Sequence, residues 1–226
     1  MITIKTDKIK DLASKVAMGV DGDRTSPISE LLEFELKDKN LTLKTTNKEY
    51  FLKAVIENVT DSEEYFHATI IADTFLTLVS KTTTNEIKLD ITDSALTFKG
   101  NGKYTFPVVL EGDDVVRLPE IPFEKDENSV EFNISGDTLK SILDFNSKEL
   151  NKEVAVDPIQ KYYYFDNEGA LTFVEGACIN EFKVESNKDF KLLLNERLVQ
   201  LFKLFAGQQV NTTIVKTETS FEDEEV

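Results

Sequence analysis

The stretch that decides the fold runs from Arg24 to Ile56 and reads RTSPISELLEFELKDKNLTLKTTNKEYFLKAVI. Apolar and polar residues alternate in three successive runs, separated by the short polar pairs Lys39-Asn40 and Asn47-Lys48. Alternation with a period of two is typical of strands with one buried and one solvated face, and links this short are typical of hairpins. The stretch therefore predicts three antiparallel strands, with Phe34 facing a core and its neighbour Glu33 facing water.

Length and composition limit the class of protein. The chain has 226 residues, 40% of them hydrophobic, with a mean hydropathy of −0.27, which predicts a soluble, folded protein of one large or two ordinary domains. No run is long enough to span a bilayer, and the start, Met1-Ile2-Thr3-Ile4, alternates like a strand instead of resembling a signal peptide. These features predict a cytoplasmic protein without a membrane segment.

Cysteine and histidine are too scarce for several kinds of site. The single cysteine, Cys178, excludes an internal disulfide framework and suits a reducing compartment. The single histidine, His67, argues against a histidine-based metal site and against a Ser-His-Asp relay. His67 is interpreted as a structural residue within a strand and Cys178 as a buried or half-buried thiol, and no metal or cofactor is predicted.

The formal net charge of −16 argues at face value against nucleic-acid binding, because neutralisation of phosphates supplies most non-specific affinity. Overall charge is a poor guide if the basic groups are gathered on one surface. The positions of the lysines therefore matter more than their number.

In the first half of the chain, strands and helices are predicted on both sides of the stretch 24–56. A helix from about residue 7 to 19, capped by Asp7, is predicted in front of it, and a helix of about ten residues capped by Asp73 behind it. The predicted strands cover 2–6, the three alternating runs, 65–71, 86–91, 96–99 and 104–110, the last two joined by Gly100-Asn101-Gly102.

Residues 111–128 break this pattern. Their acids and the prolines Pro119 and Pro122 do not suit a central strand, so this segment is interpreted as a connector between domains.

The second half repeats the order of the first. Strands are predicted at 130–134, 162–165, 170–174, 179–184, 190–194 and 210–216, with helices beginning near Ser135 or Asp137 and at Asn195, the latter ending at Gly207. The prediction is an α+β protein of two repeated domains, 1–120 and 128–226, each with two helices on one face of antiparallel sheets. The second domain is expected to lack its last strand.

Four phrases in this order resemble a known family. They are RTSPI at 24–28 followed by Leu32-Glu33-Phe34, the hairpin NLTLKTTN at 40–47, the link LPEIP at 118–122, and VEFNI at 130–134. Together they are similar to the bacterial DNA polymerase III β subunit, the DNA sliding clamp, and the resemblance covers nearly the whole chain.

The resemblance implies a DNA clamp fold and a replication processivity factor. Such a protein forms a ring of six domains, encircles double-stranded DNA without regard to sequence, tethers the DNA polymerase, and has no enzymatic activity of its own. A clamp loader is an expected partner. The residues implied to contact DNA are basic positions on the helices and one loop arginine: Lys8, Lys10, Lys15, Arg24, Lys81, Lys140, Lys148, Arg197 and Lys203.

The family also implies a pocket for short peptides of partner enzymes. In two-domain clamps it lies beside the connector, which makes Leu118, Ile121 and Phe123 the candidates here. Bacterial clamps have three domains per chain, whereas clamps of T-even phages have two. The chain is therefore expected to form a trimer if two domains are complete, or a dimer if a third is missing, and the two-domain length favours a phage source.

Three alternatives stay open. The lysines also fit ordinary solvated helix faces, and the chain also fits a clamp-fold interaction protein of the replication machinery that does not form a ring. An enzyme, such as a carboxylate-based hydrolase, would need converging acids. The acidic groups Asp113-Asp114, Glu63-Glu64 and 222–225 are instead interpreted as solvated surface.

Overall fold

The computed structural model describes residues 1–20, 26–47, 51–61, 64–92, 94–120, 125–147, 162–172, 178–181, 184–195, 201, 204–205 and 207–214. The chain divides into two compact units, residues 1–121 and 122–226, which are described separately.

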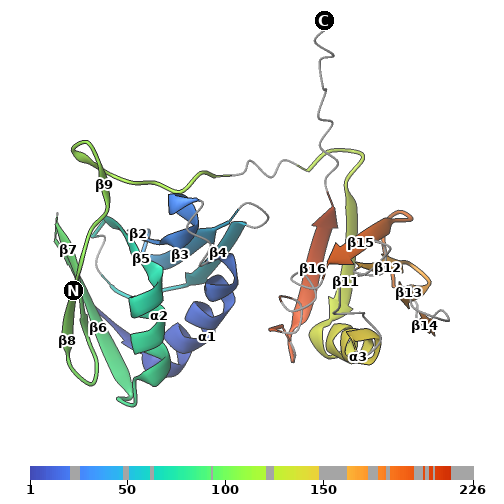
Figure 1. Ribbon diagram of the computed structural model, residues 1–226, viewed down its shortest axis with the longest axis horizontal. Coiled ribbons are helices and arrows are strands. Elements are labelled where there is room, and N and C mark those ends of the chain that lie inside the picture. The colour runs from blue at the N-terminus through green and yellow to red at the C-terminus, as the bar shows by residue number, and fades with distance from the viewer. Residues whose placement is uncertain are drawn as a thin grey trace, which may run out of the picture. The chain divides into compact units, whose positions relative to one another are not determined.

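Unit 1 holds two four-stranded antiparallel sheets and two helices. The strands are β1 (Ile2–Lys5), β2 (Leu31–Lys37), β3 (Asn40–Thr46), β4 (Phe51–Ile56), β5 (Phe66–Ile71), β6 (Glu86–Thr92), β7 (Ala95–Lys99) and β8 (Lys103–Pro107). They form the sheets β1-β6-β7-β8 and β4-β3-β2-β5. Helices α1 (Thr6–Val16) and α2 (Ala72–Lys81) pack against each other on one side of these sheets (Figure 1).

The core of unit 1 lies between the helices and the two sheets. Phe75 of α2 is fully buried at its centre and meets three other rings edge-on, with centroid distances of 4.9 Å to Phe34, 5.8 Å to Phe98 and 5.7 Å to Phe106. Edge-to-face pairs of this kind contribute beyond the area that they bury. The predicted inward face of the meander is therefore confirmed, because Phe34 from β2 belongs to this cluster.

The predicted N-caps of the two helices of unit 1 are wrong. Each helix of unit 1 follows its strand without a loop, so the N-cap residues are Lys5 and Ile71, and neither makes a side-chain capping hydrogen bond. Asp7 and Asp73 lie instead in the first turn, where a carboxylate interacts favourably with the positive end of the helix dipole.

The turn between β2 and β3 is one residue earlier than predicted. Its central residues are Asp38 and Lys39, which have φ angles of 51° and 67°. Two consecutive positive φ values are the mark of a type I′ turn, whose twist matches that of the flanking strands. Asn40, predicted to be in the turn, is the first residue of β3.

The connector begins with regular structure. Two short strands, β9 (Leu110–Glu111) and β10 (Asp114–Val115), pair as a small hairpin around Gly112, whose φ is +66°. The segment 111–128 was predicted as a connector that does not continue a central strand, and this small hairpin within it, with its own turn glycine, was not predicted.

Unit 2 repeats the order of unit 1. Its elements are β11 (Val130–Ser135), α3 (Gly136–Ser147), β12 (Tyr162–Asp166), β13 (Gly169–Thr172), β14 (Cys178–Glu181), β15 (Lys191–Asn195) and β16 (Gln209–Ile214). The sheet β14-β13-β12-β15 has the same topology as β4-β3-β2-β5, and β11 pairs with β16 as β1 pairs with β6. Among the residues that the structure describes, the second sheet of unit 2 has two strands where that of unit 1 has four.

The core of unit 2 is built around stacked phenylalanines. Phe132 and Phe190 stack at 4.6 Å, and Phe165 lies 5.4 Å from Phe190. The predicted cap of α3 at Ser135 is confirmed, because its Oγ accepts a hydrogen bond from the Thr138 N–H at 3.0 Å. The helix predicted from Asn195 to Gly207 lies largely outside the described residues.

The β2–β3 turn gives a stability prediction. Lys39→Gly should raise the free energy of unfolding by about 1 kcal/mol, because glycine adopts positive φ without the steric cost that an L side chain incurs. Lys37→Gly, at the last residue of strand β2, should lower it by up to about 0.5–1 kcal/mol. Urea unfolding followed by circular dichroism checks both, and a destabilising Lys39→Gly would contradict the assignment of the turn.

Candidate functional site

The exposed face of α1 and α2 is the first candidate surface. Ile9, Ala13 and Val16 of α1 are buried, as are Phe75 and Val79 of α2, which leaves the opposite faces of both helices to solvent. Lys8 and Lys81 are exposed on these helices, and Lys10 is partly buried. The structure thus places these three predicted DNA contacts on two adjacent helices of one unit (Figure 1).

Two of the predicted basic contacts have acidic partners. Lys15 Nζ lies 2.8 Å from the Asp11 carboxylate, and its side chain is 17% exposed. Lys140 on α3 lies 3.2 Å from Asp144. Pairs of this kind one helical turn apart contribute only a few tenths of a kcal/mol at a surface, but they reduce the positive charge offered to a phosphate.

The remaining predicted DNA contacts, Arg24, Lys148, Arg197 and Lys203, lie outside the described residues.

The second candidate surface is the opposite side of the β4-β3-β2-β5 sheet, which the connector crosses (Figure 1). Residues 116–120 of the connector, here called the strap, bind the sheet at successive positions. The Thr69 hydroxyl donates to the Val116 carbonyl at 2.5 Å, and the Leu118 N–H donates to Glu33 Oε2 at 2.7 Å. The Lys44 ammonium donates to the Glu120 carboxylate at 2.8 Å.

The Glu33 carboxylate is buried under the strap, with 1% of the residue exposed. The prediction that this residue faces water is wrong, because the strap covers this side of the sheet. Burial by itself raises the pKa of Glu33, but the nearby His67 and the hydrogen bonds from Leu118 and Lys44 stabilise the anion, and the net effect lowers the pKa. Lys44 Nζ lies 3.3 Å from Glu33 Oε1, and His67 Nε2 lies 3.2 Å from the same oxygen, outside the alignment of a good hydrogen bond.

Lys44 links the sheet to the strap. Burial lowers its pKa, but the hydrogen bond to Glu120 and the nearby Glu33 carboxylate raise it, and the net direction is upward. Glu120 is exposed, and its hydrogen bond from Lys44 lowers its pKa. Glu33, Lys44 and Glu120 therefore form one chain of charges from the interior of the sheet to the end of the strap.

The predicted peptide-binding residues lie in or beside the strap. Leu118 is 4% exposed, so its side chain faces inward in this arrangement. Ile121 and Phe123 lie outside the described residues.

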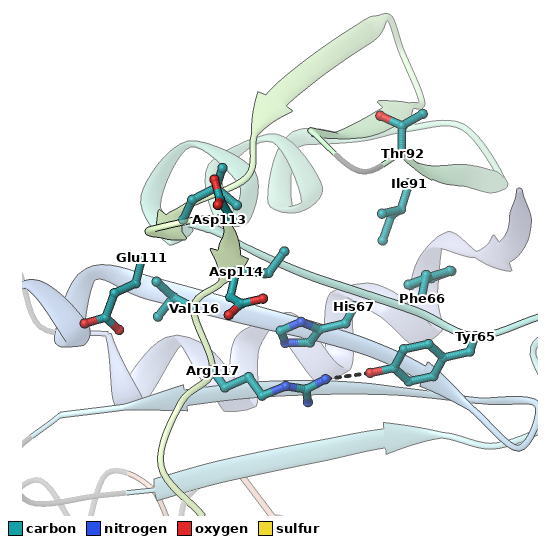
Figure 2. Close-up of a pocket in the computed structure, with 12 residues that line it drawn as sticks. Tyr65, Phe66, His67, Ile91, Thr92, Glu111, Asp113, Asp114, Val116 and Arg117 are labelled. Carbon is teal, nitrogen blue, oxygen red and sulfur yellow. Dashed lines mark hydrogen bonds between the residues drawn. The ribbon is translucent and has the colours of Figure 1, made fainter.

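A groove of about 990 Å³ opens beside the strap, between β5, the end of β6 and the β9–β10 hairpin (Figure 2). His67 and Tyr65 line one side, and the Arg117 guanidinium donates a hydrogen bond to the Tyr65 hydroxyl at 2.7 Å. The exposed carboxylates Asp113 and Asp114 lie on the hairpin (Figure 2).

Two kinds of feature matter among the described residues: metal-binding groups and membrane-spanning helices. In the ranges that the structure covers, no group of three or more histidine, cysteine or acidic side chains is arranged to hold a metal ion. No described helix has the length and apolar character needed to cross a membrane.

The strap was missed by reasoning from the sequence. Its signal is the apolar run Val115-Val116 and Leu118 inside an otherwise polar connector, which indicates a segment that packs on something. The buried charges had no such signal, because Glu33 and Lys44 occupy the polar positions of ordinary alternating strands.

Comparison with protein families gives one match. Residues 1–119 match the family described as the DNA polymerase III beta subunit, N-terminal domain. No curated protein sequence matches the chain.

Several solved structures are similar to this fold. The Helicobacter pylori beta clamp is 15% identical with a TM-score of 0.72, covering 96% of this chain and 62% of that one. The Bacillus subtilis sliding clamp is also 15% identical, with a TM-score of 0.72 and coverages of 96% and 60%. The Pseudomonas aeruginosa sliding clamp bound to griselimycin is 17% identical, with a TM-score of 0.73 and coverages of 95% and 58%. The chain thus spans about three fifths of their length.

The buried carboxylate gives a prediction about acid stability. A group whose pKa is lower in the folded state stabilises the fold above its unfolded value of about 4.5, and this stabilisation is lost as the pH falls through the folded pKa. Glu33→Gln should cost about 3 kcal/mol at neutral pH, and the difference from the wild type should shrink below about pH 4.5. Urea unfolding from pH 7 to pH 3 measures it. Glu57→Gln, at an exposed carboxylate, is the control and should change little.

Proposed function

The chain belongs to the DNA polymerase III beta subunit family, and we propose from this that it is a sliding clamp, a processivity factor that encircles double-stranded DNA and holds the DNA polymerase on it. Clamps act without catalysing a reaction, so the proposal includes no enzymatic activity. The observation that carries it is the pair of adjacent helices in the family-matched unit, with Lys8 and Lys81 exposed on them.

Contacts from these lysines would be to phosphates and independent of sequence. Phosphate contacts hold a protein on a duplex without reading its bases, and weak ones permit movement along it. Lys10, Lys15, Arg24, Lys140, Lys148, Arg197 and Lys203 complete the proposed inner surface.

Assembly into a ring is supported by the free edges of unit 1. In the described part of unit 1, β4 and β8 are outer strands of their sheets. Both carry exposed apolar side chains, with Val55 44% and Tyr104 41% exposed. Edges of this kind pair with strands of a neighbouring unit, and head-to-tail pairing closes a ring when the rotation permits. Two units per chain would give a trimer, and three in a longer chain a dimer.

The proposed partners follow from the family. One of the similar structures is the Helicobacter pylori beta clamp bound to a DNA ligase peptide, at 18% identity and a TM-score of 0.67. For this chain we propose that a replication enzyme docks a short peptide beside the connector, near the predicted positions Leu118, Ile121 and Phe123, of which Leu118 is buried while the strap is bound to the sheet. A clamp loader and a cytoplasmic location belong to the same proposal.

A second candidate function is a clamp-fold interaction protein that does not form a ring. It is favoured by the two-stranded sheet β11-β16 in the described part of unit 2 and by the net charge of −16. A sheet with fewer strands offers a different edge for ring closure, which gives this alternative its structural basis.

The role of the helix lysines is tested by comparing two double variants that change the net charge equally, one on the helix face and one on a sheet. Lys8→Glu with Lys81→Glu should weaken duplex binding and reduce the slope of log K against log salt by up to about 1.8, about 0.9 for each phosphate that the protein no longer neutralises. Lys88→Glu with Lys103→Glu changes the net charge equally at exposed sheet positions and should leave the slope unchanged. Fluorescence anisotropy of a labelled duplex over a salt series is the measurement, and an equal weakening of binding in both pairs would contradict the assignment.

Ring formation is tested by mass. Light scattering over a concentration series should give a stable trimer, and Val55→Lys with Tyr104→Lys should dissociate it, because a charge on each free edge opposes strand pairing. Leu110→Lys, at a residue that is 50% exposed on the small hairpin, is the matched control and should leave the mass unchanged.

A monomer at every concentration would favour the second candidate function. A ring that has threaded onto a duplex should also stay bound after both DNA ends are blocked, and should leave after the duplex is cut.

A further inference from the structure

The strap determines how much chain lies between the two units. Its last contact with unit 1 among the residues that the structure describes is the hydrogen bond between Lys44 and Glu120. On the other side, Lys125 is ion-paired with Glu131 of β11, so it belongs to unit 2. Four residues lie between these two attachments.

We propose that the strap is a releasable clasp held by Glu33, and that its release about doubles the length of chain between the units. From Glu120 to Lys125 the chain has five steps and reaches at most about 18 Å. If the strap detaches as far as Val116, the free segment has nine steps and reaches about 32 Å. This inference does not depend on DNA binding or on ring formation.

Glu33 determines whether the strap stays bound, because two attachments of the strap depend on the charge of this residue. One carboxylate oxygen accepts the Leu118 N–H at 2.7 Å, and the other lies 3.3 Å from Lys44 Nζ, which in turn holds Glu120. Neutralising Glu33 weakens the acceptor of Leu118 and leaves Lys44 with less of the negative charge that orients it. A charge-assisted hydrogen bond is about twice as strong as a neutral one, so the Leu118 attachment weakens directly. The Lys44–Glu120 pair keeps both of its charges and loses only the orientation that Glu33 gives to Lys44.

Release is expected to stop at Val116. The Val116 carbonyl is bound by Thr69, and the Val116 N–H donates to the Val109 carbonyl at 3.1 Å. Neither contact involves Glu33. Beyond Val116, the Arg117 side chain is largely exposed and bonds to Tyr65 at the surface, where such contacts are weak.

The clasp is separable from the fold of unit 1. Leu118 is buried, but it lies outside the hydrophobic cluster formed by the sheets and the helices. The side chain of Phe34, next to Glu33, points to the other side of the sheet and belongs to that cluster. Opening the strap therefore exposes one sheet face and leaves the packed interior in place.

A force that pulls the two units apart would break the attachments of the strap one after another. Glu120 and Leu118 are the attachments nearest to unit 2, so a force that separates the units reaches them before Val116. The free chain between the two units is therefore short while the strap is bound and longer after a pulling force has detached it.

Amide hydrogen exchange of the full chain tests the clasp. In Glu33→Gln the exchange rate of the Leu118 amide should rise at least tenfold more than the exchange rates of the β2 and β3 amides, and trypsin should cut after Arg117 more rapidly. Glu120→Gln weakens the outer attachment without altering the buried carboxylate, and it should raise the exchange rate of the strap by a smaller factor. Small-angle scattering should show a larger maximum dimension for Glu33→Gln, and Glu57→Gln should match the wild type in every measurement.

Two results would overturn the proposal. One is unchanged protection of Leu118 in Glu33→Gln. The other is an equal loss of protection throughout unit 1 in both variants, which would mean that these residues hold the fold and not a clasp.

Discussion

A carboxylate buried in a β-sheet needs partners that the sheet alone does not provide, and Glu33 sets this constraint for unit 1. Its strand neighbour on β3 supplies one cation, Lys44, at 3.3 Å. The other strong donor is the Leu118 N–H, which comes from 85 residues further along the chain. An unpaired buried charge is costly, so the connector has to cross the sheet at this point, and the path of the chain out of unit 1 follows from one electrostatic requirement.

This constraint separates the two candidate surfaces. The helices cover one side of the β4-β3-β2-β5 sheet and the strap covers the other, with the aromatic cluster around Phe75 between the sheet and the helices (Figure 1). Close packing makes such a core stiff, which isolates small changes on one side from the other. A partner that binds at the connector would therefore leave the helix face in place, and one unit has room for two independent contacts.

The strands could be predicted from the sequence because a period of two is a direct consequence of one-sided burial. The same rule failed at Glu33, since alternation shows that one face is buried but does not show whether the other face is later covered by a distant segment. The helix starts were misplaced for a different reason: Lys5 and Ile71 end strands that run straight into helices, so no capping residue was needed. The lysines of α1 were placed on the helix correctly, but the Asp11–Lys15 pair depends on rotamers that spacing only suggests.

The charge of the helix face bears on how such a protein would hold DNA. Helices α1 and α2 carry four lysines against three aspartates, so this face is close to neutral in a chain whose net charge is −16. Exposed charges further apart than about 8 Å are largely screened at physiological salt, so the acidic groups elsewhere on the chain oppose contact at this face only weakly. The affinity of a protein for duplex DNA rises with the number of phosphates that it neutralises, so a face with so little net positive charge would bind DNA weakly. A near-neutral face is a poor basis for tight binding, but it suits a protein that is retained by enclosing the duplex, since enclosure holds the DNA without strong contacts and leaves the protein able to slide.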